Sequence, residues 1–444
     1  MKTCRRLLSL LLCLLTLLCV AVPAMADDGP LPYAMTVIVG EQSFRVRAYS
    51  ESYMGNLYLS LSDLAFALNG TEKQFQIHYS KSNSAFSITT GQGAYSGSSQ
   101  DTGWMGVAYL YLQQNRLLVN GKERRNYTYC TDLDMFMNMI DVQLILDLEI
   151  EPLDELTLVL HPDRPFSPDP AELAAEGYFD AYNGILIGDA DTGEILFSHN
   201  HDRAVPIASI TKLMSYLLIR EAADAGEISM DDAIAASTKA AVLSWTADGT
   251  ISLQTGKEYP MFEMLNAMLL ASSNECTLAL AEHVAGSEEA FVERMNQRAG
   301  ELELRSARFY TPHGLPSYGM GPVRGKRQNC MSALDLFKLC RYLLSEHPEI
   351  TEITSQQLCR MEELDYTTYN SNPLVFNMDG VTGLKTGFTN KAGSCLAASM
   401  PVPTEDGQHN LVLVVLGAEA AEQRNQAAEL LMRWAQRLYT DRLS

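Results

Sequence analysis

The sequence predicts a multidomain protein in which a small α+β module precedes a larger α/β domain with an antiparallel sheet and an inserted helical lobe. Three observations lead to this prediction. The chain has 444 residues, more than one hydrophobic core usually organises. Residues 161–170 contain four prolines, which favours an extended connector over a helix or a central strand. Beyond that connector, strand patterns at both ends enclose a series of helix patterns.

The first segment, residues 1–26, is predicted to be a signal peptide. Three cations precede an apolar run over residues 7–22 and an Ala-x-Ala cleavage site at residues 24–26. The mature protein is therefore expected outside the cytoplasm, in the cell wall or secreted. Retention of the leader as an anchor is the disfavoured alternative, because the apolar run is near the lower length limit for crossing a bilayer.

Charge and cysteine content exclude several classes of partner and site. Loss of the three leader cations takes the formal net charge from -21 to -24, which argues against nucleic acid or anionic lipid as a partner. The cysteines of the mature chain are scattered, so we expect buried free thiols rather than the disulfides that export would permit. No metal-ligand spacing occurs, so the sequence predicts no metal and no other cofactor.

Residues 31–161 are predicted to form the small α+β module. Alternating apolar patterns predict strands that lead into a short helix over residues 62–68, capped by Ser62. A fainter copy follows, with a second short helix predicted from 131 to about 140 and a strand at 143–146. This repeat resembles the copper amine oxidase-like N-terminal domain of exported bacterial proteins. The resemblance implies no copper, because the stretch contains only two histidines.

The larger domain is predicted over residues 178–440, after a linker at 162–177. Strands are predicted at 184–189, 194–198, 393–400 and 411–417. Helices are predicted at 206–222, 261–270, 277–284, 288–302, 333–344 and 423–438. We therefore expect one sheet that joins the two ends of the domain and a helical lobe inserted between its strands.

Three short motifs occur in order within this domain. A single Ser-x-x-Lys contains Ser209 and Lys212, Ser272-x-Asn274 follows, and a single Lys-Thr-Gly begins at Lys385. A serine hydroxyl needs a nearby base to act as a nucleophile, and residues three apart share one face of a helix. Lys212 is therefore expected beside Ser209, with a pKa lowered by burial and by the ammonium of Lys385.

The second motif lies on a loop between two predicted helices. The hydroxyl of Ser272 is suited to relay a proton to a leaving group, and the amide of Asn274 to hold a substrate carbonyl. The backbone amides of Ser209 and Phe388 are expected to form an oxyanion hole.

The third motif is predicted to begin an edge strand. The cation of Lys385 and the hydroxyl of Thr386 suit a free carboxylate, and Gly387 permits close approach of another backbone. Each motif also has an ordinary structural interpretation, with Ser209 as a helix cap and Lys212 as a solvated cation. The ordered combination favours the chemical interpretation.

The three motifs are those of penicillin-binding proteins and class A β-lactamases. With further segments, including Thr-Pro-His-Gly at 311–314 and Gly-Leu-Lys-Thr-Gly-Phe-Thr at 383–389, residues 178–438 resemble a low-molecular-mass penicillin-binding protein of the D-alanyl-D-alanine carboxypeptidase type, peptidase family S11. The resemblance implies a β-lactamase/transpeptidase-like DD-peptidase fold. It also implies removal of the terminal D-Ala from peptidoglycan stem peptides, and acylation by β-lactam antibiotics.

The resemblance also implies roles for the motif residues: Ser209 as the acylated nucleophile, Lys212 as the base, Ser272 and Asn274 as the relay and binding pair, and Lys385 and Thr386 as the clamp for the terminal carboxylate. Two departures from the family pattern stand out. Residues 272–276 read Ser-Ser-Asn-Glu-Cys, where the family usually has Gly or Ala and then Asp-Ala. The chain ends soon after the closing helix, so we expect neither the C-terminal β-domain nor the membrane anchor of many members.

Three alternatives remain open from the sequence. A serine β-lactamase would share the fold, but the Glu-x-x-Leu-Asn loop of class A enzymes is missing between the second and third motifs. A DD-endopeptidase would use the same residues on a cross-linked substrate. A catalytically idle cell-wall-binding protein is disfavoured, because every motif residue is retained. A Ser-His-Asp triad is also disfavoured, since no Gly-x-Ser-x-Gly elbow occurs.

Overall fold

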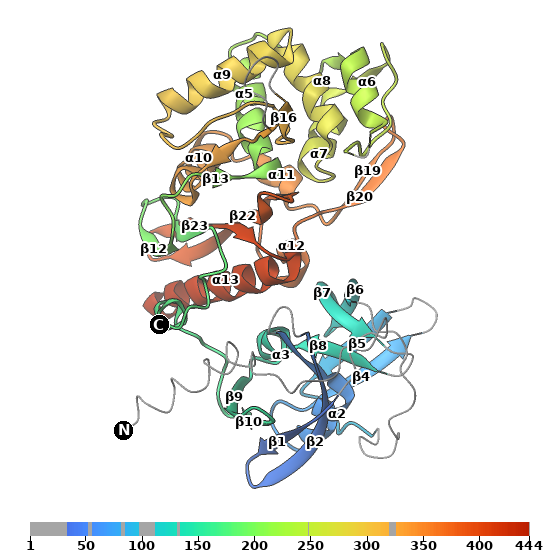
Figure 1. Ribbon diagram of the computed structural model, residues 1–444, viewed down its shortest axis with the longest axis vertical. Coiled ribbons are helices and arrows are strands. Elements are labelled where there is room, and N and C mark those ends of the chain that lie inside the picture. Colours follow the sequence, from blue (N-terminus) through green and yellow to red (C-terminus); the bar gives the residue numbers. More distant parts are fainter. Residues whose placement is uncertain are drawn as a thin grey trace. The chain divides into compact units, whose positions relative to one another are not determined.

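The computed structural model describes residues 33–51, 56–80, 85–96, 112–130, 134–246, 248–318 and 326–443. They divide into two compact units, the first ending at Glu176 and the second beginning at Gly177 (Figure 1). The predicted leader, residues 1–26, lies outside the described residues. Within the described ranges, no helix has both the length and the apolar character needed to cross a membrane.

The first unit contains a ten-stranded sheet and three short helices among its described residues, of which the last, α4 (Pro170–Ala175), belongs to the linker described below. The strands are β1 (Tyr33–Val39), β2 (Gln42–Glu51), β3 (Asn56–Ser60), β4 (Phe75–Ser80), β5 (Ala85–Thr90), β6 (Leu112–Val119), β7 (Lys122–Cys130), β8 (Met135–Asn138), β9 (Glu149–Asp154) and β10 (Thr157–His161). The first two helices are α2 (Leu61–Ala67), which follows β3, and α3 (Met139–Leu146), which follows β8.

The sheet of the first unit is built from two copies of one pattern. Each copy is a hairpin, then a strand with a short helix, then a second hairpin. The strand order is β4-β5-β6-β7-β8-β3-β2-β1-β10-β9. The antiparallel pair of β3 and β8 lies at the centre, and the first hairpins of the two copies extend from it in opposite directions. The second hairpin of each copy pairs in parallel with the first strand of the other, β5 with β6 and β10 with β1. The repeat of strand, short helix and hairpin predicted from the sequence is therefore present.

Three local predictions for this unit were wrong in detail. Helix α2 is capped by Ser60, not by Ser62. The helix predicted over 131–140 is the strand β8 at its centre, and α3 begins only after its cap, Asn138. The strand predicted at 143–146 belongs to α3. All four residues of β8 are buried, and a short run buried on both faces does not reveal its period. Pairing with β3 and β7 makes this segment a strand.

The Pro-rich linker ends in a short helix, α4 (Pro170–Ala175). Pro170 occupies the first helical turn, where a missing backbone N–H costs little. The side chain of Asp169 caps the helix by accepting a hydrogen bond of 2.8 Å from the amide of Ala171. The connector is extended only before this helix, from residue 165 to 169.

The second unit is organised around a five-stranded antiparallel sheet of order β12-β11-β23-β22-β21. Its strands are β11 (Gly184–Asp189), β12 (Ile195–His199), β21 (Gly383–Thr389), β22 (Gly393–Thr404) and β23 (Gly407–Ala418). The pairing of β11 with β23 joins the two ends of the unit, as predicted. Helix α13 (Ala421–Leu443) packs on one face of the sheet, and α10 (Ala333–Glu346) on the other (Figure 1).

The inserted lobe consists mainly of helices. They are the 3-10 turn η1 (Ala208–Thr211), α5 (Lys212–Asp224), α6 (Thr238–Ser244), α7 (Met261–Leu269), α8 (Asn274–Ala285), α9 (Glu288–Glu301), α11 (Ile350–Thr354) and α12 (Leu374–Asn377). Short strands join them as pairs: β13 (Val205–Pro206) with β18 (Cys330–Met331), β14 (Ala233–Ala235) with β15 (Glu258–Pro260), β16 (Ser317–Tyr318) with β17 (Lys326–Arg327), and β19 (Leu358–Met361) with β20 (Tyr366–Tyr369).

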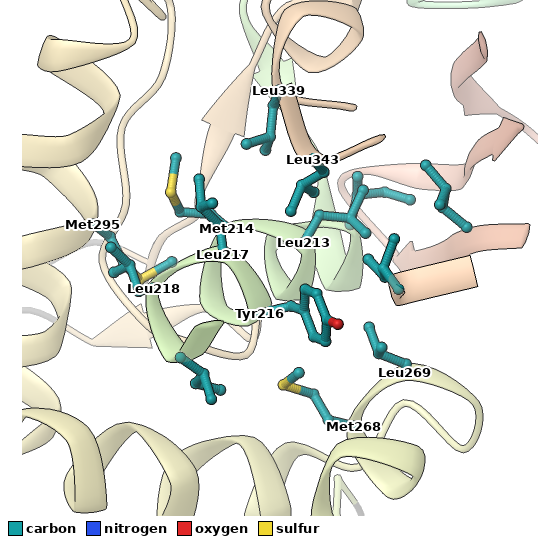
Figure 2. Packing of buried hydrophobic residues seen from close by; sticks show 14 of the residues in the cluster. Leu213, Met214, Tyr216, Leu217, Leu218, Met268, Leu269, Met295, Leu339 and Leu343 are labelled. Atoms are coloured by element: carbon teal, nitrogen blue, oxygen red, sulfur yellow. The ribbon is translucent and has the colours of Figure 1, made fainter. Parts of the chain in front are cut away.

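Helix α5 lies in the middle of the lobe. In Figure 2 its side chains Leu213, Tyr216 and Leu217 lie among Met268 of α7 and Leu343 of α10, and all five are essentially inaccessible to solvent. Each such side chain contributes about 1.5–3 kcal/mol by leaving water. This packing holds both the axis and the rotation of α5, and thereby the position of the residues at its N-terminal end.

Candidate active site

Ser209 and Lys212 lie where η1 runs into α5. The helix predicted from residue 206 begins later, because its first turn is a 3-10 turn in which Ala208 has a left-handed φ of +47°. Two glycines border this turn, and neither has room for a side chain. A Cβ on Gly387 would lie 2.9 Å from the amide nitrogen of Ser209, and one on Gly314 would collide with the carbonyl of Ala208. This turn therefore sits directly against strand β21.

Lys212 is completely buried, and its amine is surrounded by neutral oxygens. The Nζ donates hydrogen bonds to Ser209 Oγ at 2.9 Å, Asn274 Oδ1 at 2.8 Å and the carbonyl of His313 at 2.8 Å. Within the part of the chain described, no carboxylate forms an ion pair with it. Burial holds the pKa of Lys212 well below its usual value, and the positive charge of Lys385 lowers it further.

The second motif lies at the start of α8, which is capped by Ser273. Asn274 is its first residue, and its amide is held at both ends. Oδ1 accepts from Lys212, and Nδ2 donates to the carbonyl of Asp248 at 2.8 Å. Ser272, just before the cap, is partly exposed in a left-handed conformation with φ +59°. No hydrogen bond of its hydroxyl is found in the described residues, so of the two motif residues only Asn274 is hydrogen-bonded to Lys212.

The third motif lies on β21, the edge strand of the five-stranded sheet. Lys385 is buried and donates to the carbonyl of Thr386 at 3.1 Å. Burial, and then the positive charge of Arg424 on α13, lower its pKa to about 7. The hydroxyl of Thr386 lies 2.6 Å from that of Ser371, which follows β20. The side chain of Phe388 is 61% exposed, so only its backbone belongs to the close-packed part of the site.

Four contributors to this site escaped prediction from the sequence. They are the carbonyls of His313 and Asp248, the guanidinium of Arg424 and the hydroxyl of Ser371. A backbone carbonyl leaves no signal in residue type, and the other two residues belong to no short motif. The carbonyl of His313 could have been found from the Thr-Pro-His-Gly segment, because this segment belongs to the family pattern.

The imidazole of His313 is not a base in this arrangement. Burial lowers its pKa to about 3, and its Nδ1 accepts a hydrogen bond of 3.2 Å from the amide of Leu315. Within the described residues, no group of His, Cys, Asp and Glu side chains is arranged to hold a metal ion. The six cysteines in this part of the chain are free thiols, as predicted, and three are only partly buried. The arrangement is suited to acyl transfer through a serine activated by an amine.

Comparisons with known proteins agree with this chemistry. The family described as D-alanyl-D-alanine carboxypeptidase, peptidase S11, matches residues 171–420. D-alanyl-D-alanine carboxypeptidase DacF of Bacillus subtilis is 33% identical over 273 residues, which cover 61% of this chain and 66% of that protein. The chain thus spans just under two thirds of that relative.

Two solved structures share the fold of the second unit. The peptidoglycan synthesis regulatory factor PBP3 of Streptococcus pneumoniae has a TM-score of 0.53 at 29% identity, over 57% of this chain and 71% of that one. Penicillin binding protein 6B of Escherichia coli has a TM-score of 0.51 at 30% identity, over 61% of this chain and 80% of that one. Both share mixed α/β content and an antiparallel sheet with the second unit.

Proposed function

Because the chain belongs to the D-alanyl-D-alanine carboxypeptidase family, peptidase S11, we propose that it is a serine carboxypeptidase that removes the terminal D-Ala from peptidoglycan stem peptides. One observation carries the proposal. The amine of Lys212 lies 2.9 Å from the hydroxyl of Ser209, among neutral oxygens, with a pKa well below its usual value. An amine with a lowered pKa, within hydrogen-bond reach of a serine hydroxyl, is suited to accept the proton of that hydroxyl.

Acylation begins when Lys212 accepts the proton of Ser209. The Oγ of Ser209 then forms a bond to the carbonyl carbon of the D-Ala-D-Ala peptide bond, and the oxyanion is stabilised by the amides of Ser209 and Phe388. Ser272 relays the proton to the leaving nitrogen as the C–N bond breaks. D-Ala departs as a neutral amine, and water then hydrolyses the ester to regenerate Ser209.

The positive charge around β21 accounts for exopeptidase selectivity. Lys385 and Thr386 bind the carboxylate of the terminal D-Ala, and the charge of Arg424 adds to that of Lys385. Gly387 is needed for close approach, because a side chain there would press on the amide of Ser209. A substrate without a free terminal carboxylate lacks this contact.

β-Lactam antibiotics are proposed inhibitors of the same site. Their strained amide presents a carbonyl to Ser209, and their carboxylate suits the Lys385 cation. The Glu-x-x-Leu-Asn loop that supplies the deacylating base of class A β-lactamases is missing from this sequence. The acyl-enzyme is therefore expected to persist.

We also propose that residues 31–161 form a copper amine oxidase-like N-terminal domain, and that residues 178–440 form the DD-carboxypeptidase domain. The internal repeat of the first unit supports the former, since both copies have the strand, helix and hairpin of the sequence pattern. Cleavage of a signal peptide at residue 26 would deliver the enzyme to the cell wall or the medium, where its proposed substrate lies.

Two assays on the mature chain, residues 27–444, test the proposal. A fluorescent penicillin should label it covalently, and Ser209→Ala should abolish the labelling. The unsubstituted enzyme should release D-Ala from a diacyl-Lys-D-Ala-D-Ala peptide. Stoichiometric labelling of the alanine variant would place the nucleophile elsewhere, and labelling without release of D-Ala would reject the carboxypeptidase.

A further inference from the structure

A second buried ionisable group lies beside the site and has no role in the mechanism above. Glu275 directly follows Asn274 in the first turn of α8, and its side chain is inaccessible to solvent. Its Oε1 accepts hydrogen bonds from the amides of Thr250, at 2.9 Å, and Ile251. Its Oε2 is buried without a hydrogen-bond partner among the described residues. Burial of a carboxylate with one unsatisfied oxygen lowers the stability of the fold. A functional role would explain why such a group is present beside the site.

The two contacts of Glu275 bear on Asn274. The carbonyl of Asp248, two residues before Thr250, accepts from Nδ2 of Asn274 at 2.8 Å. Two consecutive residues of α8 therefore hold the same loop, residues 248–251. Because Nδ2 points to Asp248, Oδ1 of the same amide is turned toward Lys212. The loop, the Asn274 amide and the base form one connected set.

Glu275 also supplies negative charge close to the base. The groups that act on Lys212 lie on several elements: Lys385 on β21 lowers its pKa, whereas Glu275 on α8 raises it. Two further titratable groups stay neutral near pH 7. Burial raises the pKa of the Cys276 thiol far above its usual value and lowers that of the His313 imidazole to about 3. Apart from burial, which lowers the pKa of Lys212 most, the charges that act on it near pH 7 are thus one cation and one carboxylate.

We propose that Glu275 is a positioning residue for acylation, which anchors the 248–251 loop that orients Asn274 and counters the positive charge of Lys385 at Lys212. This inference rests on the proposed function, because it takes Lys212 as the base. It also gives a role to the carboxylate that follows Asn274, a glutamate at the position where the family usually has Asp.

Glu275→Gln tests the negative charge of Glu275 while keeping its hydrogen bonds to the 248–251 loop. The glutamine keeps an oxygen for the two loop amides but carries no charge, so the pKa of Lys212 should fall further. The acid limb of the penicillin acylation rate against pH should then move to lower pH by roughly half to one unit, so that at a pH below the midpoint the variant acylates about three- to tenfold faster. Lys385, whose pKa is about 7, also changes its charge in this pH range, so the midpoints of the two profiles are compared rather than the rates at a single pH.

Glu275→Ala removes the anchor as well. The amides of Thr250 and Ile251 lose their acceptor, so their hydrogen exchange should become faster than in the unsubstituted enzyme and in Glu275→Gln. Acylation should fall at every pH, by about ten- to a hundredfold, because Asn274 is no longer held in place. Thermal unfolding and exchange elsewhere in the second unit check that this variant folds. If it does not, Glu275→Gln still decides the charge, and Glu275→Asp, whose shorter side chain reaches the two amides less well, decides the anchor: their exchange should be faster than in the unsubstituted enzyme, and unchanged exchange would overturn the anchor.

Glu263→Gln is the matched control. Glu263, on α7, is also buried, and its carboxylate accepts from the backbone amides of residues 362–364. It is not among the groups that shift the pKa of Lys212. Its neutralisation should leave the midpoint of the acylation profile unchanged.

The outcomes are distinct. Superimposed profiles for Glu275→Gln and the unsubstituted enzyme, or an equal shift in Glu263→Gln, would overturn the role of the charge. Unchanged exchange of residues 250 and 251 in a folded Glu275→Ala would overturn the anchor. Failure of the unsubstituted enzyme to label at Ser209 would instead reject the proposed function, whereas normal labelling with an unshifted profile rejects only the role of Glu275.

Discussion

The first unit holds a partly buried cation and the second a fully buried one, and the two are surrounded in opposite ways. In the first unit, the guanidinium of Arg47 lies 2.8 Å from a carboxylate oxygen of Asp63 and 2.7 Å from one of Asp134. Burial lowers the pKa of Arg47, but the two carboxylates outweigh it and the net shift is upward. In the second unit, the described residues place neutral oxygens alone within hydrogen-bond distance of the Lys212 amine, and its pKa is lowered.

The difference shows how the surroundings of a cation shift its pKa, upward beside carboxylates and downward among neutral oxygens. A cation paired with carboxylates keeps its proton and ties strands together, and removal of either partner leaves an uncompensated charge. A lysine among hydroxyl, amide and carbonyl oxygens is still well hydrogen-bonded. It has little to stabilise its charge, so it becomes a base. The four predictions that follow test this contrast.

The largest effect is expected at Lys212. Lys212→Ala should slow acylation of Ser209 by a fluorescent penicillin at least about a thousandfold, because nucleophile and base act as a unit. Lys212→Arg should be similarly slow, since a guanidinium keeps the charge but does not give up its proton near neutral pH. Rapid-mixing kinetics measure both. A near-normal rate in either variant would mean that Lys212 is not the base.

Arg47→Met should change stability and leave catalysis alone. It strands the buried carboxylates of Asp63 and Asp134, which should cost about 3 kcal/mol in the free energy of unfolding of the first unit. Urea unfolding measures the loss, and the penicillin acylation rate serves as the control. Adding Asp134→Asn should recover part of the stability. If stability is unaffected, the ion pairs of Arg47 with Asp63 and Asp134 do not stabilise the first unit.

A smaller effect is expected at the proposed carboxylate clamp. Amidation of the terminal D-Ala should lower turnover about ten- to a hundredfold, since a charge-assisted contact is worth roughly 1.5–3 kcal/mol. In Thr386→Val the penalty should be clearly smaller, because part of the contact is already missing. The double cycle of enzyme and substrate isolates the interaction. Equal penalties in both enzymes would show that Thr386 does not contact the carboxylate.

The smallest effect concerns a paired cation in the second unit, away from the site. His409 Nδ1 lies 2.7 Å from Oδ2 of Asp189, and this hydrogen bond raises the pKa of His409 above its usual 6.5. The stabilisation is complete below about pH 6.5 and is lost as pH rises through the raised pKa. His409→Gln should remove this pH dependence, worth less than about 1 kcal/mol for a partly exposed pair. Unfolding temperatures at pH 6 and 8.5 measure it, and an unchanged slope would contradict the pairing.

Parts of the fold could be predicted from the sequence because the turn residues agreed with the strand pairing of the folded chain. The turn that joins β11 to β12 was marked by Asp-Thr-Gly, and that between β6 and β7 by Asn-Gly, where Asn120 and Gly121 both adopt positive φ. The failures at β8 and α3 have a common cause. Both segments are buried on more than one face, so their apolar residues show no period, and only the neighbouring strands select strand or helix.

The sequence by itself determined which groups take part in the proposed chemistry and in what order they occur. Ser209 and Lys212 stand three apart at the start of a helix, and Lys385, Thr386 and Gly387 are consecutive residues of one strand, β21; both are local properties of the chain. Only the tertiary structure decided how the base is tuned. The carbonyl of His313 approaches Lys212 from a segment about a hundred residues away, and carbonyls are alike in every residue. Electrostatic balance depends on distance and burial, which no motif records, so the role of Glu275 became visible only in the folded chain.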